Sequence, residues 1–174
     1  MREAFGAAPF LVRHRLCGHP LFDLPRLVEL ARTLPAAQVE YNAGNVPITL
    51  DPKATPRNGL SAEETVRRIA ECSSWLVLKN VESDPEYARL LAACLAEVRR
   101  YVPALSEQQG FIFVSSPGAL TPYHLDPEEN FLLQVRGRKV MQVFSSEDRA
   151  VLSEEQIERF FSGAHRNLEF REEY

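Results

Sequence analysis

The fold class is decided by residues 111–144, FIFVSSPGALTPYHLDPEENFLLQVRGRKVMQVF. Short apolar runs alternate here with Gly, Pro, Ser and Asn, and this pattern is typical of consecutive antiparallel strands. The last two runs flank Arg136-Gly137-Arg138 and predict a hairpin with Gly137 at its bend. Short antiparallel strands of this kind indicate a sandwich or a jelly roll. The predicted strands comprise residues 111–114, 121–126, 130–135 and 139–144.

Helices are predicted on both sides of this stretch. Ser61 with Glu64, and Ser153 with Gln156, have the spacing of capping boxes that begin helices. Residues 36–60 carry many turn signals and predict a long surface connection, with one short strand near 46–50. The remaining predictions are helices at 24–34, 61–72, 85–102 and 153–163 and a strand at 75–78.

These elements predict an α+β protein in two parts. Residues 1–108 form a helical N-terminal region that packs on a β-barrel, and residues 109–174 form the first part of a jelly roll, a double-stranded β-helix. The chain has 174 residues, 45% of them apolar, which is enough for a proper core.

Composition excludes several classes of function. The net charge is −4, so nucleic acid is not expected as a partner. No stretch of about 20 apolar residues is present, so no membrane partner is expected. The 3 cysteines are too few and too scattered for a disulfide framework or a zinc motif, which favours a reducing cytoplasm.

His124 and Asp126 carry the chemistry that the sequence suggests. Residues at i and i+2 of a strand point to the same face, with Cα atoms about 7 Å apart. An imidazole and a carboxylate so placed supply two of the three ligands of a 2-His-1-carboxylate iron site. A His-X-Asp triplet also arises often by chance, and the alternative is a solvated or mutually hydrogen-bonded surface pair.

Three neighbouring side chains strengthen the metal interpretation. Lys139 lies on the second strand of the predicted hairpin. Its ammonium group and the hydroxyl of Thr121 can together hold the distal carboxylate of a small ligand. Asn130 offers an amide near the metal end. Such a pocket suits a small dicarboxylic keto acid. The alternatives are an exposed hairpin lysine and an asparagine that is satisfied by its own turn.

Residues 111–144 resemble the core of the JmjC and cupin-like Fe(II)/2-oxoglutarate dioxygenases, especially the branch that contains the asparaginyl hydroxylase of hypoxia-inducible factor. That family has a Thr, then His-X-Asp, then Asn, then Gly and Lys on the next strand. This chain has the same order at compatible spacing, in Thr121, His124, Asp126, Asn130, Gly137 and Lys139.

The resemblance implies a role for each residue. His124 and Asp126 are the expected iron ligands, and Thr121 and Lys139 the expected partners of the far carboxylate of 2-oxoglutarate. Asn130 is expected to donate a hydrogen bond near the metal-chelating end. The implied reaction is oxidative decarboxylation of 2-oxoglutarate coupled to hydroxylation, or demethylation through a hydroxymethyl group, of a protein side chain or a small molecule.

One departure from the family concerns its second histidine ligand, which lies on a later strand. After Lys139 the chain has only His165, directly after a helix end, where an interaction with the helix C-terminus is the preferred interpretation. Either the chain is a fragment that lacks later strands, or it is a short relative with a degenerate site. Half a jelly roll exposes strand edges and an apolar face, which a homodimer could cover.

Two functions follow as hypotheses. The first is an Fe(II)- and 2-oxoglutarate-dependent oxygenase. The second is a non-catalytic cupin-like binding or regulatory module with a degenerate metal site. A cupin enzyme that uses a metal without 2-oxoglutarate is disfavoured by the pairing of Thr121 with Lys139.

Overall fold

The computed structural model describes residues 4–46, 48, 56–102 and 104–174. In these residues the chain is a mixed α/β protein, so the predicted α+β class is confirmed at that level. The α-helices are α1 (Leu24–Thr33), α2 (Ala62–Arg67), α3 (Pro85–Arg99) and α4 (Glu154–Phe161), and the strands are β1 (Val39–Ala43), β2 (Ser74–Leu78) and β3 (Ile112–Ser115). Short 3-10 turns lie at η1 (Pro20–Phe22), η2 (Ala36–Gln38) and η4 (Val81–Ser83).

The three strands form one antiparallel sheet in the order β1-β2-β3. The register places Leu76 of the central strand opposite Tyr41 of β1 and opposite Val114 of β3. Because β3 lies beyond residue 108, this sheet joins the two predicted parts of the chain.

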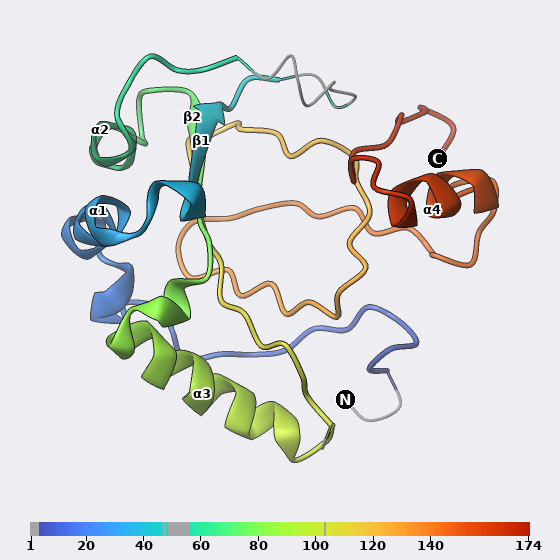
Figure 1. Cartoon of the computed structure of the whole chain (residues 1–174), viewed down its shortest axis with the longest axis horizontal. Coiled ribbons are helices and arrows are strands. Elements are labelled where there is room, and N and C mark those ends of the chain that lie inside the picture. The colour runs from blue at the N-terminus through green and yellow to red at the C-terminus, as the bar shows by residue number, and fades with distance from the viewer. Residues whose placement is uncertain (1–3, 47, 49–55, 103) are drawn as a thin grey trace.

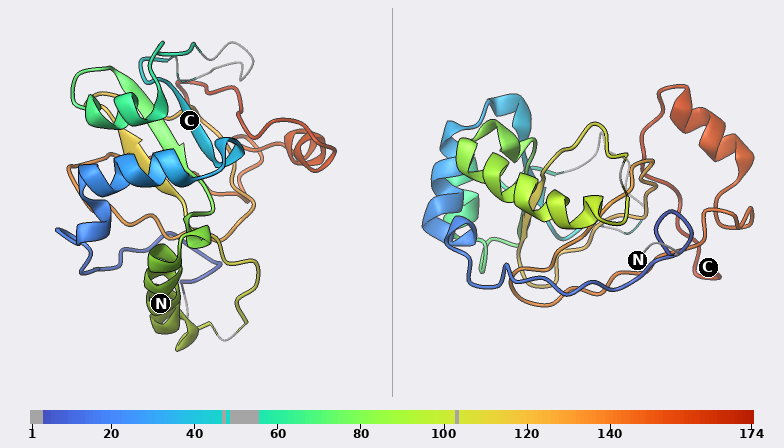
Figure 2. Two further views of the ribbon diagram at one scale, coloured as in Figure 1. Left: turned by 60° about the vertical axis from the view of Figure 1, so that its left-hand side comes forward. Right: turned by 90° about the horizontal axis from the view of Figure 1, so that it is seen from below.

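The hydrophobic core lies between this sheet and the helices. Helices α1 and α2 cover one face of the sheet, and the long connection after β3 extends away from them (Figures 1 and 2). Leu30 of α1, Val66 of α2 and Leu76 of β2 have 0% exposure. The core as a whole comprises Leu27, Leu30, Ala31, Leu34, Ala62, Val66, Leu76, Leu78, Val81 and Tyr87.

Both predicted capping serines lie at helix starts, and the complete capping box is the one at Ser153. The Ser153 hydroxyl accepts from the backbone N–H of Gln156, and the Gln156 side chain accepts from the backbone N–H of Ser153. The Ser61 hydroxyl accepts from the backbone N–H of Glu64. Helix α2 ends at Arg67, earlier than predicted, and hydrogen-bonded turns continue to Cys72.

The surface connection predicted for 36–60 is wrong in its first part, which contains β1. The sequence Val-Glu-Tyr-Asn-Ala has weak strand propensity because of its Glu and Asn. Pairing with β2 overrides that preference, and Val39 and Tyr41 pack against the core. The short strand predicted near 46–50 lies largely outside the described residues.

The predicted hairpin of 130–135 and 139–144 is also wrong, because neither segment forms a strand. Gly137 does make the expected turn, with φ of +74°. The residues before Gly137 lie beside the N-terminal segment that contains Phe5 and His14. The centroids of the Phe5 and Phe131 rings are 5.9 Å apart, and His14 Nε2 lies 3.1 Å from the carbonyl oxygen of Gln134. A two-stranded hairpin alone is marginally stable in water, so such competing contacts decide the outcome.

The strand predicted at 121–126 is reduced to a single bridge, between His124 and Asn167. The described strands all belong to the three-stranded sheet or to this bridge, and they do not make up a double-stranded β-helix. Within the described part of the chain, no helix is long and apolar enough to cross a membrane.

Candidate functional site

The segment that carries His124 is held from both sides by its backbone. Leu125 N–H donates to the Arg166 carbonyl at 3.1 Å, and Leu168 N–H donates to the Tyr123 carbonyl at 2.9 Å. Tyr123 N–H donates to the Ile48 carbonyl at 3.0 Å. These bonds fix the segment although it forms no extended ladder.

The ring of Tyr123 anchors the same segment in an aromatic cluster. It lies 5.4 Å from the Phe144 ring, 5.7 Å from Phe170 and 5.9 Å from Tyr174. Its hydroxyl donates to the Val151 carbonyl at 3.2 Å. The backbone from which His124 projects is therefore fastened to the C-terminal end of the chain.

The imidazole of His124 is held in one orientation. Its Nδ1 lies 2.7 Å from the carbonyl oxygen of Pro122, and because a carbonyl only accepts, Nδ1 is the donor. Nε2 then faces Asp126, with its lone pair available whenever the ring is neutral. Metal-binding histidines are commonly oriented by such a hydrogen bond from the other ring nitrogen.

The structure brings His124 and Asp126 together as predicted. Nε2 lies 3.6 Å from Oδ2 of Asp126, and the two side chains are 25% and 33% exposed. The Asn130 amide donates to the same Oδ2 at 3.1 Å. Three of the predicted site residues therefore meet around one carboxylate oxygen.

Each member of the pair shifts the pKa of the other. The Asp126 carboxylate raises the pKa of His124, against the opposing effect of burial. The imidazole of His124, with smaller contributions from Arg166 and Asn130, lowers the pKa of Asp126 in spite of its burial. The carboxylate is therefore the stable form of Asp126 at neutral pH.

The separation of His124 Nε2 and Asp126 Oδ2 is that of an ion pair, and it also falls in the range for two atoms that share one divalent ion. Atoms that each bind one ion at about 2.1 Å lie about 3.0 Å apart at a right angle and about 4.2 Å apart on opposite sides. The separation of 3.6 Å lies between these limits. An imidazole nitrogen and a carboxylate oxygen are ligands that iron accepts.

The other two predicted residues form a pair of their own. Lys139 Nζ donates to the hydroxyl of Thr121 at 3.0 Å. Partial burial of its ammonium group lowers the pKa of Lys139, although Lys139 and Thr121 are both exposed residues. An ammonium group so placed retains donors for an anionic group.

His165 does not join His124 and Asp126. Its Nδ1 accepts from the backbone N–H of Asn167 at 3.0 Å, a local contact within its own loop. Among the described residues, no three His, Cys, Asp or Glu side chains are grouped closely enough to hold a metal ion together.

Sequence reasoning missed Arg166. Its guanidinium pairs with Asp126 Oδ1, and its second nitrogen lies 3.4 Å from Glu128 Oε1. Forty residues separate it from Asp126, and neither its spacing nor its neighbours indicated the contact. The bridge between His124 and Asn167 brings it there.

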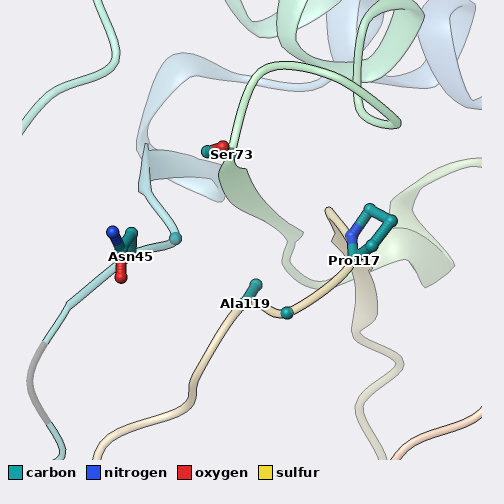
Figure 3. A pocket seen from close by; sticks show the side chains of 6 residues that line it. Asn45, Ser73, Pro117 and Ala119 are labelled. Atoms are coloured by element: carbon teal, nitrogen blue, oxygen red, sulfur yellow. The ribbon is translucent and has the colours of Figure 1, made fainter.

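The hollow in Figure 3 is a separate feature. It measures about 240 Å³ and lies where β1, β2 and the turn after β3 meet. Its lining contains no titratable side chain and none of the predicted site residues. The lining residues are Gly44, Asn45, Ser73, Pro117, Gly118 and Ala119.

Comparison of the chain with protein-family models, with curated proteins and with solved structures gave no match. The case for a function therefore rests on the side chains around Asp126 and Lys139.

Proposed function

We propose that this chain is an Fe(II)- and 2-oxoglutarate-dependent oxygenase of the JmjC/cupin-like type, a hydroxylase or demethylase that acts on a protein or small-molecule C–H bond. The observation that carries the proposal is the separation of 3.6 Å between His124 Nε2 and Asp126 Oδ2. The order of Thr121, His124, Asp126, Asn130 and Lys139 along the chain supports it.

Each residue has a role in this proposal. His124 and Asp126 hold the ferrous ion, and the Pro122 carbonyl keeps the imidazole turned toward it. Lys139 and Thr121 bind the distal carboxylate of 2-oxoglutarate through charge-assisted hydrogen bonds. Asn130 steadies the Asp126 carboxylate and donates near the chelating end of the keto acid. The bound ion and co-substrate supply the oxidising chemistry.

The proposal carries one further expectation. A ferrous enzyme suits a reducing cytoplasm, which agrees with the free thiols of Cys17, Cys72 and Cys94.

Binding of 2-oxoglutarate in the presence of Mn²⁺, a redox-stable substitute for Fe²⁺, tests the proposal by calorimetry. Lys139→Ala is expected to lose oxoglutarate affinity and to keep metal affinity, whereas His124→Ala is expected to lose both. Lys79→Ala is the matched control, because Lys79 pairs with Glu40 at 2.6 Å on β1. Unchanged binding in both site variants contradicts the proposal.

The second candidate is a non-catalytic cupin-like module that binds a metal weakly. The absence of a third ligand around His124 and Asp126, among the described residues, favours it. Turnover separates the two candidates. The enzyme converts 2-oxoglutarate to succinate when Fe²⁺ and oxygen are supplied, and the module does not. His165→Ala lowers that turnover only if His165 is recruited as a ligand.

A further inference from the structure

The backbone of residues 139–144 offers unused hydrogen-bonding groups. Among the described residues, no backbone N–H or C=O of this segment takes part in a backbone hydrogen bond. The segment runs from the turn at Gly137 across the molecule toward α4 (Figures 1 and 2). A row of unpaired N–H and C=O groups is a template on which another strand can pair.

The same segment exposes apolar side chains to water. Val140, Met141 and Val143 are 90%, 49% and 64% exposed. Valine is among the residues that favour strands, and burial of these side chains against a neighbouring strand would stabilise the pair. An exposed apolar segment with an unpaired backbone is a place where proteins associate.

The preceding segment, residues 130–135, gives the chain a second run without a strand partner. It leads into the turn at Gly137, and its Leu132 is 51% exposed. The two segments form no hairpin within the single chain, since a two-stranded hairpin alone is marginally stable in water. Two copies of the chain supply four such segments, and three or more strands with apolar side chains are stable together.

The charges at the two ends of residues 139–144 favour a second copy as the partner. Arg136 and Arg138 precede the segment, Glu147 and Asp148 follow it, and all four are exposed. An antiparallel pair of identical segments places the positive end of each beside the negative end of the other. Opposite charges across a strand pair are stabilising, whereas a parallel pair would bring like charges together.

Strand β3 is the competing edge for association. It is an outer strand of the sheet, and Phe113 on it is 58% exposed. No charged residue lies within two positions of either end of Ile112–Ser115. Charge therefore gives no preference for a second copy at β3, in contrast to residues 139–144.

We propose that residues 139–144 pair antiparallel with the same residues of a second copy, so that the chain forms a two-fold homodimer in which the hairpin around Gly137 becomes ordered. The inference does not depend on the proposed function, because it rests on the backbone of this segment and on the charges that flank it. Such an interface is small and therefore weak, so the dilute chain is monomeric.

Sedimentation of the whole chain from micromolar to submillimolar concentration tests the dimer. Arg138→Glu places like charges at both ends of the pair and is expected to weaken association about three- to thirtyfold, and Glu147→Arg should do the same. The double variant Arg138→Glu with Glu147→Arg reverses both charges and should restore the dimer. Arg89→Glu, a charge reversal at an exposed position of α3, is the matched control and should leave association unchanged.

Amide hydrogen exchange locates the interface. Protection of the Met141 and Val143 amides is expected to rise with the concentration of the chain, because interstrand hydrogen bonds form there. A chain that stays monomeric at submillimolar concentration overturns the proposal. A dimer that is insensitive to the charge reversals, is not restored by the double variant, or gains protection at β3 instead also overturns it.

Discussion

The region of the sheet and helices α1–α3 differs sharply from the region that follows β3. In the first, Leu30, Leu76 and Leu78 are fully buried in one core. In the second, Leu132, Val140 and Val143 are 51%, 90% and 64% exposed. Apolar burial therefore stabilises the first region, whereas backbone bridges, ring contacts and ion pairs hold the second. The candidate site lies in the less buried region, and ligand-binding segments are commonly drawn from regions with few buried apolar contacts.

Removal of a core side chain tests this difference between the two regions most strongly. Leu30→Ala is expected to lower the free energy of unfolding by about 2–5 kcal/mol, because it creates a cavity between α1 and the sheet. Val140→Ala is the matched control and should change it by less than about 0.5 kcal/mol. Urea denaturation measures both. Equal losses in the two variants contradict the contrast between regions.

The junction of the two regions is expected to be the next most sensitive place. Ser116, the first residue after β3, is 5% exposed. Its hydroxyl accepts from Ser74 N–H at 2.9 Å and donates to the Ile69 carbonyl. Ser116→Ala leaves the Ser74 N–H and the Ile69 carbonyl without these partners. It should lower the free energy of unfolding, measured by urea denaturation, by about 2–3 kcal/mol. The neighbouring, exposed Ser115→Ala should cost little, and a similar loss there contradicts a specific role for Ser116.

A smaller effect is expected at Tyr87, where α3 meets the core. The ring is 2% exposed, its hydroxyl donates to the Leu21 carbonyl at 2.6 Å, and the Arg26 guanidinium lies 5.0 Å from the ring centre. Tyr87→Phe should lower the free energy of unfolding by about 1 kcal/mol at neutral pH.

The same variant has a pH signature. Burial raises the pKa of Tyr87 from 10.0 to about 12. The folded state thus retains the phenol proton more tightly than the unfolded state, and this contribution is full below pH 10 and lost as the pH rises to 12. Tyr87→Phe should therefore lose less stability over that interval than the original chain. Tyr101→Phe, at an exposed ring, should lose as much as the original chain.

The sequence predicted the first region better than the second because its signals there are local. Ser61 and Pro85 indicated the starts of α2 and α3, and the apolar run at 75–78 indicated β2. Strand β1 was missed because Glu40 and Asn42 obscure its pattern, and only pairing with β2 makes it a strand. The hairpin around Gly137 was predicted from short apolar runs on either side of a turn residue. Strand formation also depends on the neighbouring strand, which this local pattern does not specify.

The candidate site could be predicted in part for the same reason. His124, Asp126 and Asn130 are close in the chain, and the structure places them around one carboxylate oxygen. Thr121 and Lys139 also meet, although neither lies on the strand predicted for it. Arg166 could not be foreseen, because its contact with Asp126 spans 40 residues and depends on one isolated bridge.

The central claim is that these two groups of side chains serve one pocket, with an ion at His124 and Asp126 and a keto diacid that also reaches Lys139. The coupling between ligands tests it most directly, as the 2-oxoglutarate affinity measured with and without saturating Mn²⁺. The account predicts at least a tenfold gain on adding Mn²⁺, about 1.4 kcal/mol of coupling, and no gain in His124→Ala. An oxoglutarate affinity that is the same with and without the metal would contradict it.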